Sequence, residues 1–108
     1  MRWAYRSLGE QDEGSTVVVR WRGSAADVLL LDPVNFTRYC EARHPVFYSA
    51  GGRYTRAPAR LTIPRDGRWY VVADLHGFSR HAEATVEVVT RDGTVGQVID
   101  QEAPLEVG

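Results

Sequence analysis

Cysteine is nearly absent from the chain, lysine is absent altogether, and no long apolar run occurs. The single Cys40 cannot form a disulfide within the chain, which is typical of a reducing compartment, so we expect a cytoplasmic protein. No segment approaches the roughly 18 apolar residues of a membrane-spanning helix, and the N-terminal sequence has no signal-peptide core. We therefore expect neither a membrane span nor a secretory leader.

Charge is nearly balanced, because 13 arginines face 14 acidic residues and leave a net charge of -1. A chain without positive excess lacks the attraction on which most nucleic-acid binding depends, so we expect no nucleic-acid partner. The balance is uneven along the chain. Residues 38–80 contain eight arginines against three acidic residues, whereas residues 81–108 contain one arginine against six. The middle of the chain therefore offers a positive region to an anion.

The length and composition are those of one ordinary globular domain. The chain has 108 residues, of which 44% are hydrophobic and 25% charged, and such a domain can bury a core without disulfides or metal ions. We expect a single domain over residues 1–100 and a frayed tail over residues 101–108.

Alternation of apolar and polar residues with a period of two predicts β-strands. Residues 16–22 have this pattern, and residues 68–75 are largely apolar on both faces, so we expect the second of these strands at the centre of a sheet. Other strands are predicted at residues 1–6, 26–31, 46–49, 61–63 and 82–89, with a weaker edge strand at 94–100.

The three tryptophans, Trp3, Trp21 and Trp69, each fall in phase with the apolar face of a predicted strand. In the first strand this phase places Met1, Trp3 and Tyr5 together. We therefore expect all three indoles in the core rather than on a ligand-binding surface.

One helix interrupts the strands. Asp32 is a good N-cap, Pro33 suits the first turn, and Phe36, Tyr39 and Cys40 follow with helical spacing. We expect a short helix at about residues 33–43 that covers one open end of the sheets and holds Cys40 as a small buried side chain.

Turn sequences separate the strands at short intervals, which favours an antiparallel arrangement over alternating strands and helices. The predicted fold is therefore all-β: an antiparallel β-sandwich, or flattened barrel, of seven to eight strands with one short α-helix.

A family resemblance rests on the order of several short segments. These are Leu30-Leu-Asp-Pro-Val-Asn-Phe36 with Tyr39, Phe47-Tyr-Ser-Ala-Gly-Gly52, Ala57-Pro58, Ile63-Pro64 and Gly67-Arg-Trp-Tyr-Val-Val-Ala-Asp-Leu75. In this order the chain resembles the bacterial domain-of-unknown-function family numbered eighteen eighty-three, over nearly the whole of residues 1–89. The resemblance implies a small all-β protein, found alone or ahead of TIR domains, with no established activity.

The first candidate site is the segment from residue 48 to 56, which we expect to be a loop. Paired glycines let a backbone approach a ligand closely, arginines bind phosphate or carboxylate, and tyrosines stack on a base or sugar. The alternative is a plain hairpin loop with solvated arginines. The candidate ligand-binding residues here are Tyr48, Gly51, Gly52, Arg53, Tyr54 and Arg56.

The second candidate is the pair Asp74 and His76, which lie two residues apart on one strand face. A carboxylate beside an imidazole can orient a base, but zinc needs three or four ligands, so we expect no metal. A structural role for Asp74 at the strand end is the alternative. Neither Cys40 nor any serine stands in a recognisable nucleophile motif.

These patterns favour a cytoplasmic binding or interaction module, without cofactor, that recognises an anionic small molecule or glycan. Two other classes stay open: a partner of a TIR-type defence effector, implied by the resemblance alone, and an enzyme using Asp74 and His76. Residues 1–6, 46–49 and 94–100 are candidate sheet edges, and an open edge can support a homodimer.

Overall fold

The computed structural model of the chain describes residues 3–22, 25–43, 45–74, 84–91, 103–104 and 106–107. Strands and one helix follow each other within these residues. In chain order they are β1 (Trp3–Gln11), β2 (Thr16–Trp21), β3 (Ala26–Leu31), α1 (Pro33–Cys40), β4 (Ala50–Tyr54), β5 (Ala59–Thr62), β6 (Gly67–Asp74), β7 (Ala84–Val89), β8 (Ala103–Pro104) and β9 (Glu106–Val107).

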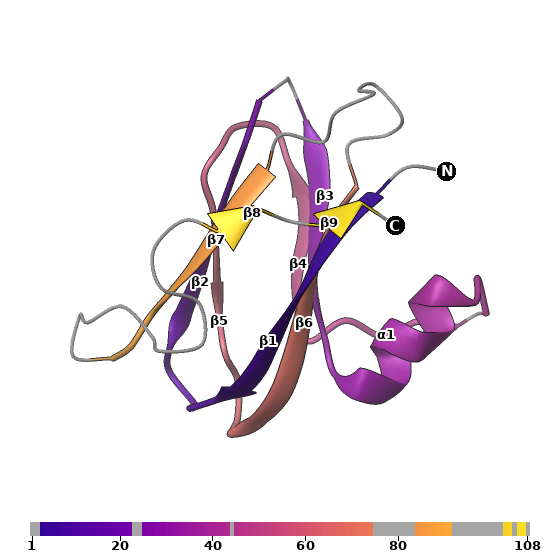
Figure 1. Ribbon diagram of the computed structural model, residues 1–108, viewed down its shortest axis with the longest axis horizontal. Helices are drawn as coiled ribbons and strands as arrows, with labels where there is room; N and C mark the ends of the chain where they lie inside the picture. Colours follow the sequence, from indigo (N-terminus) through magenta and orange to yellow (C-terminus); the bar gives the residue numbers. More distant parts are fainter. Residues whose placement is uncertain are drawn as a thin grey trace.

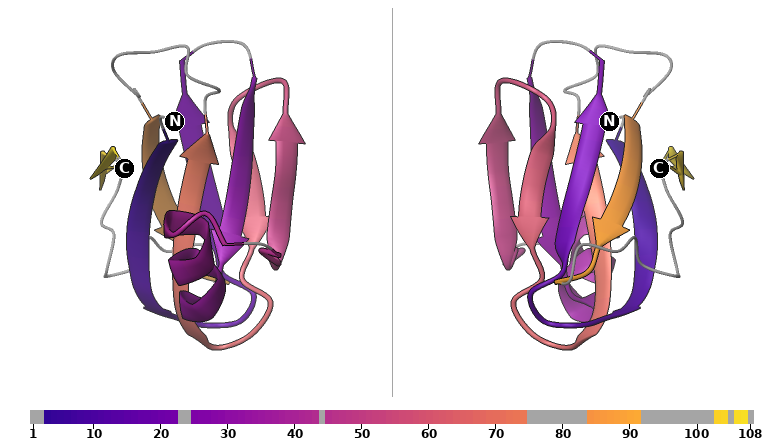
Figure 2. Two further views of the ribbon diagram at one scale, coloured as in Figure 1. Left: turned by 90° about the vertical axis from the view of Figure 1, so that its right-hand side faces the viewer. Right: turned by 90° about the vertical axis from the view of Figure 1, so that its left-hand side faces the viewer.

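The strands form two sheets that face one another (Figures 1 and 2). Sheet A has the order β4-β3-β6-β1-β9 and sheet B the order β5-β2-β7-β8. Every described pairing is antiparallel. The predicted antiparallel sandwich with one short helix is confirmed, and the two separate sheets exclude the flattened barrel.

The core lies between the sheets and is built from the alternate residues of each strand. Trp21 and Trp69 are both buried there, as predicted. The Trp69 indole Nε1 donates to the Arg65 carbonyl oxygen at 3.0 Å, so its one polar group is satisfied. Fully buried aliphatic side chains around the indoles include Leu8, Leu30, Leu61, Ile63, Val17, Val19, Val28, Val71 and Val86.

Strand β6 is central in sheet A, between β3 and β1, as its two apolar faces predicted. Trp69, Val71 and Ala73 point into the core, while Val72 on the other face is also fully buried. The outer face of β6 therefore needs cover of its own, and helix α1 supplies it.

Helix α1 packs on the outer face of sheet A, in front of β6 and β3 (Figure 2, left). The Phe36 ring stacks on Tyr70 with centroids 4.1 Å apart, and it lies 5.4 Å from the Tyr5 ring. The expectation that the helix covers an open end of the sandwich is therefore wrong. The apolar side of the helix packs instead on the aromatic side chains of the outer face of sheet A.

The helix ends are set by local chemistry. The Asp32 carboxylate accepts a hydrogen bond from the Asn35 amide at 2.8 Å, which confirms the predicted N-cap. The helix ends at Cys40 rather than Arg43, and Ala42 just beyond it adopts a φ of 53°, which no helical residue has. Cys40 is exposed rather than buried.

The phase of β1 also differs from the prediction. Ala4 and Leu8 are the core residues of this strand, whereas Tyr5 faces outward beneath α1. An apolar residue normally identifies the core side of a strand. Here the outer side of β1 also carries an apolar residue, because the helix covers it. The side chains of Met1 and Trp3 lie outside the described part.

The prediction of a strand at residues 46–49 is wrong, because the pairing with β3 begins only at Ala50. Strand β4 spans Ala50–Tyr54 and pairs with β3, so Gly51 lies opposite Leu29 and Gly52 opposite Val28. Both glycines have positive φ, 120° and 141°. The segment expected to be a Gly-rich loop is thus an edge strand that requires glycine for its backbone conformation.

The C-terminal segment takes part in both sheets. Strand β8 pairs with β7, and β9 pairs with Ala4 and Tyr5 of β1. Part of the segment for which we expected a frayed tail therefore forms two short strands. The edge strand predicted at residues 94–100 lies outside the described residues.

Replacing the two β4 glycines separately should give unequal losses of stability. A Cβ at Gly51 would overlap the Val28 carbonyl oxygen, whereas a Cβ at Gly52 meets nothing within 4 Å. Both changes place alanine at positive φ, which costs about 1–3 kcal/mol. We expect Gly52→Ala to lose about that much and Gly51→Ala clearly more, as measured by urea unfolding. Equal losses would contradict the close approach of β4 to β3.

Candidate functional site

A row of polar side chains crosses the outer face of sheet A. The strand register places Arg53 of β4 opposite Asp27 of β3, and Asp27 opposite Asp74 of β6. Arg53 Nη1 lies 3.9 Å from Asp27 Oδ1. Two carboxylates on directly opposed residues repel each other, and the guanidinium at the edge offsets part of that repulsion. Together with Tyr39 we call these residues the polar row.

Tyr39 joins the polar row from helix α1. Its hydroxyl lies 3.5 Å from Asp74 Oδ2 and donates to it. Burial raises the pKa of Tyr39 above its usual value, and the Asp74 and Asp27 carboxylates raise this pKa further. The phenol therefore stays protonated and links the helix to the end of β6.

The structure separates the candidate residues of the predicted loop. Arg53 joins the polar row, whereas Tyr54 points inward and packs against the core. Tyr48 is half exposed before the start of β4, and Arg56 is exposed in the connection to β5. Gly51 and Gly52 serve the pairing with β3. Tyr48, Tyr54 and the glycines therefore do not form one binding loop with the arginines.

The second predicted pair is only half described. Asp74 lies at the end of β6, hydrogen-bonded to Tyr39, while His76 lies outside the described residues. The sequence analysis missed Asp27 and Tyr39 as neighbours of Asp74. Asp27 had a signal, because it is the polar residue on the outward phase of an otherwise apolar strand. Tyr39 had none, since its contact spans 35 residues of sequence.

Arginines gather on the outer face of sheet B. Arg60 of β5 and Glu87 of β7 both lie opposite Val18 of β2, and Arg20 is two residues farther along β2 on the same face. Arg20 Nη1 pairs with Glu87 Oε1 at 3.2 Å. The pairing of β2 with β5 also brings the end of β2 beside the start of β5, where Arg22 and Arg56 lie exposed.

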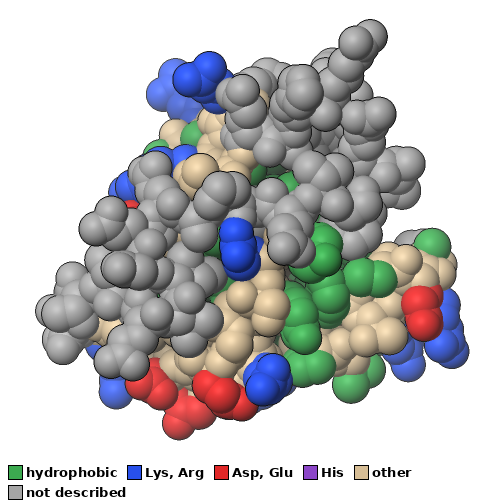
Figure 3. Space-filling model, in the orientation of Figure 1, with side chains coloured by type: hydrophobic (Ala, Val, Ile, Leu, Met, Phe, Trp, Pro, Cys, Tyr) green, Lys and Arg blue, Asp and Glu red, His purple; other side chains and the backbone are tan. Residues whose placement is uncertain are grey.

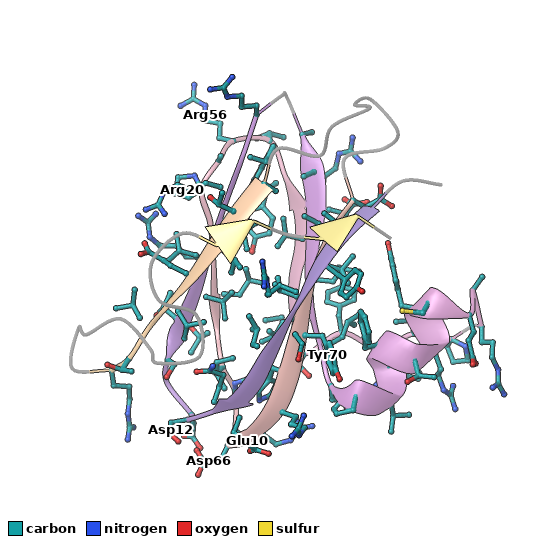
Figure 4. All side chains as sticks on the ribbon, viewed as in Figure 1. Glu10, Asp12, Arg20, Arg56, Asp66 and Tyr70 are labelled. Carbon is teal, nitrogen blue, oxygen red and sulfur yellow. The ribbon has the colours of Figure 1, made fainter. Side chains whose placement is uncertain are left out.

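We call Arg20, Arg22, Arg56 and Arg60 the arginine face. Arg20 and Arg56 project from the same side of the molecule (Figure 4), and basic side chains gather at the upper left of the surface in Figure 3. Within the described part of the chain, neither Arg56 nor Arg60 forms an ion pair.

Acidic side chains gather at the end of the sandwich opposite Arg56. Glu10, Asp12 and Asp66 lie there together (Figure 4), and Asp66 Oδ1 accepts a hydrogen bond from the Glu13 amide at 2.7 Å. A pocket of about 360 Å³ at this end is lined by Asp12, Glu13, Ser15, Asp66, Thr90 and Arg91. Among the residues that the structure describes, no three His, Cys, Asp or Glu side chains are placed so that they could hold a metal ion together, these carboxylates included.

Cys40 is exposed, but it is not an activated nucleophile. Partial burial raises the pKa of its thiol, and the neighbouring Glu41 carboxylate raises it further. Both effects keep the sulfur protonated, whereas a reactive cysteine needs a lowered pKa.

The fold and these surfaces define a small all-β sandwich protein whose polar chemistry lies on its outer faces. The model of the family described as Domain of unknown function (DUF1883) matches residues 1–92, so the chain belongs to that family. No curated protein and no solved structure matches the chain. None of the described helical residues forms a helix long and apolar enough to cross a membrane.

Removing the Tyr39 hydroxyl should change how stability depends on pH. Because the folded pKa of Tyr39 lies above its usual value of 10.0, the unfolded chain loses this proton first, and stability falls as the pH rises past about 10. We expect the free energy of unfolding of Tyr39→Phe to fall less steeply than that of the wild type between pH 9 and 11. Tyr48→Phe, at an exposed position, should keep the wild-type slope. Identical slopes for all three proteins would contradict the raised pKa of Tyr39.

Proposed function

We propose that the protein is a binding module that recognises an anionic small molecule or an anionic glycan through the arginine face. The supporting observation is that Arg56 and Arg60 are exposed and form no ion pair with any described residue. Guanidinium groups bind carboxylate and phosphate through paired hydrogen bonds, so we expect the ligand to carry one of these two groups. The cytoplasmic location expected from the single cysteine is part of the same proposal.

The local charge favours this surface over the polar row. Among the described residues, the arginine face has four arginines and one facing carboxylate, Glu87, which is engaged by Arg20. The polar row has one arginine beside Asp27 and Asp74, so its net charge repels an anion. Of the predicted loop residues, Arg56 is therefore the one that belongs to the proposed site.

The spacing of the arginines indicates a ligand with more than one anionic group. Residues two apart on a strand are separated by about 6.6 Å, and neighbouring strands by about 4.8 Å. Arg20 and Arg60 stand on neighbouring strands, and Arg22 follows Arg20 at the first of these distances. A single anion reaches one or two of the guanidinium groups, whereas a tripolyphosphate or a uronic-acid oligosaccharide reaches several.

Reversing the charge of Arg56 and Arg60, which form no ion pair with a described residue, tests the proposal. We expect tripolyphosphate, or tetragalacturonic acid, to raise the melting temperature of the wild type and to bind it measurably by calorimetry in 50 mM salt. Each charge-assisted hydrogen bond lost costs about 1.5–3 kcal/mol, so Arg56→Glu with Arg60→Glu should weaken binding at least about tenfold. Binding should also weaken in 200 mM salt.

Arg68→Glu is the matched control. Arg68 is equally exposed but lies in sheet A, with its Nε 3.6 Å from Glu10, so this variant should bind like the wild type. The proposal is wrong if neither probe binds the wild type, or if Arg68→Glu loses as much affinity as the double variant.

A further inference from the structure

Arg6 is a charged side chain on the core side of β1. Its neighbours on the same face, Ala4 and Leu8, are fully buried core residues. Arg6 pairs with Val71 of β6, which is also fully buried. The side chain therefore points toward the space between the two sheets, and these three described neighbours offer it no charge and no side-chain hydrogen bond.

The Arg6 Nε atom is buried without a hydrogen-bond acceptor. Among the described residues, the other such buried side-chain atom is Nε1 of Trp21, which also faces the core. Both atoms are N–H donors without an acceptor. A buried donor without an acceptor is destabilising, and an unpaired charged group more so. Trp69 shows the contrast, since its indole donates to a backbone carbonyl.

Arg6 also lies at a rim of the sandwich. Strand β9 pairs with Ala4 and Tyr5 and with no residue beyond them toward the end of β1. On the facing sheet, β8 pairs only with Thr85 and Val86 of β7. Within the described residues, the edge of β1 is therefore unpaired from Arg6 onward. Arg6 as a whole is partly exposed, although its Nε atom is buried.

We propose that Arg6 anchors a carboxylate or phosphate group that enters the sandwich at the rim where β9 ends. An anion supplies the acceptor that Nε lacks, and it neutralises the charge at the edge of an apolar interior. This site is separate from the arginine face, which lies on the outer side of sheet B. Its existence does not depend on the proposed function.

The direct test observes the Arg6 Nε–H group by nuclear magnetic resonance of the wild-type protein. Its resonance is assigned as the one that disappears in Arg6→Lys. Titration with inorganic phosphate and, separately, with acetate should shift this resonance until it saturates, whereas sodium chloride at equal ionic strength should not. The anion that saturates at lower concentration identifies the preferred group. The proposal fails if phosphate and acetate both act no differently from chloride.

A second test uses the stability of Arg6→Met. Without added anion, this variant should melt a few degrees above the wild type, because it no longer buries an unpaired donor. Its melting temperature should not respond to the anion that shifts the Arg6 resonance, whereas that of the wild type should rise. Arg68→Met, at an exposed position near the start of β6, should keep the wild-type response.

The outcomes separate the possible roles of Arg6. A variant Arg6→Met that melts well below the wild type, or does not fold, would show that the chain itself satisfies this side chain and would overturn the proposal. Arg6→Lys keeps the charge but lacks the planar group, so it should retain a weaker anion response. Charge reversal at Arg56 and Arg60 should leave the Arg6 resonance shift unchanged, so failure of one site is distinguishable from failure of the other.

Discussion

The burial of β6 on both of its faces is the constraint on which the rest of the structure depends. Trp69, Val71 and Ala73 are covered by sheet B, but Tyr70 and Val72 point to the other side of sheet A. A strand with two apolar faces is stable only when both are shielded from water. Helix α1 therefore belongs to the core architecture, and its Phe36 ring lies nearly parallel to Tyr70, at 3°. A stacked aromatic pair contributes about 0.5–1.5 kcal/mol beyond the area it buries.

The same constraint decides where polar chemistry can lie. The inner faces are filled mostly by apolar side chains and the middle of the outer face of sheet A is covered by the helix, so most polar groups are left to strand ends, edges and the outer face of sheet B, with Arg6 as an exception. Asp74 follows the last buried residue of β6, and Tyr39 reaches it from the last turn of α1. The polar row thus marks the border of the region that α1 covers. Sheet B has no helix on its outer face among the described residues, and Arg22, Arg56 and Arg60 are exposed on this side.

The sequence predicts what is local and periodic, and it fails where a contact is distant. Alternation located the buried faces of β2, β6 and β7, and the Asp32 cap located the start of α1. The pair Gly51 and Gly52 predicted a loop, because local chemistry does not reveal that β3 lies close enough to pair with them. The surface beneath α1 could not be predicted either, since Phe36 and Tyr70 meet only after the sheet has formed. The sequence also does not show that β4 ends at Tyr54. It therefore could not predict that Tyr54 packs against the core while Arg56 lies exposed beyond the strand.

The interior position of Arg6 follows from the cover on β6. Phe36 packs against aromatic side chains on the outer face of sheet A, and Tyr5 is one of them. Once Tyr5 faces the helix, the alternation of the strand turns both of its neighbours, Ala4 and Arg6, toward sheet B. The sequence pattern assigns the opposite phase to β1, because Tyr5 is more apolar than Arg6. The helix contact on one face of the sheet thus places a charge on the other. An inward guanidinium persists in a sandwich of this size only if the free energy gained by Tyr5 and Phe36 exceeds the cost of placing Arg6 there.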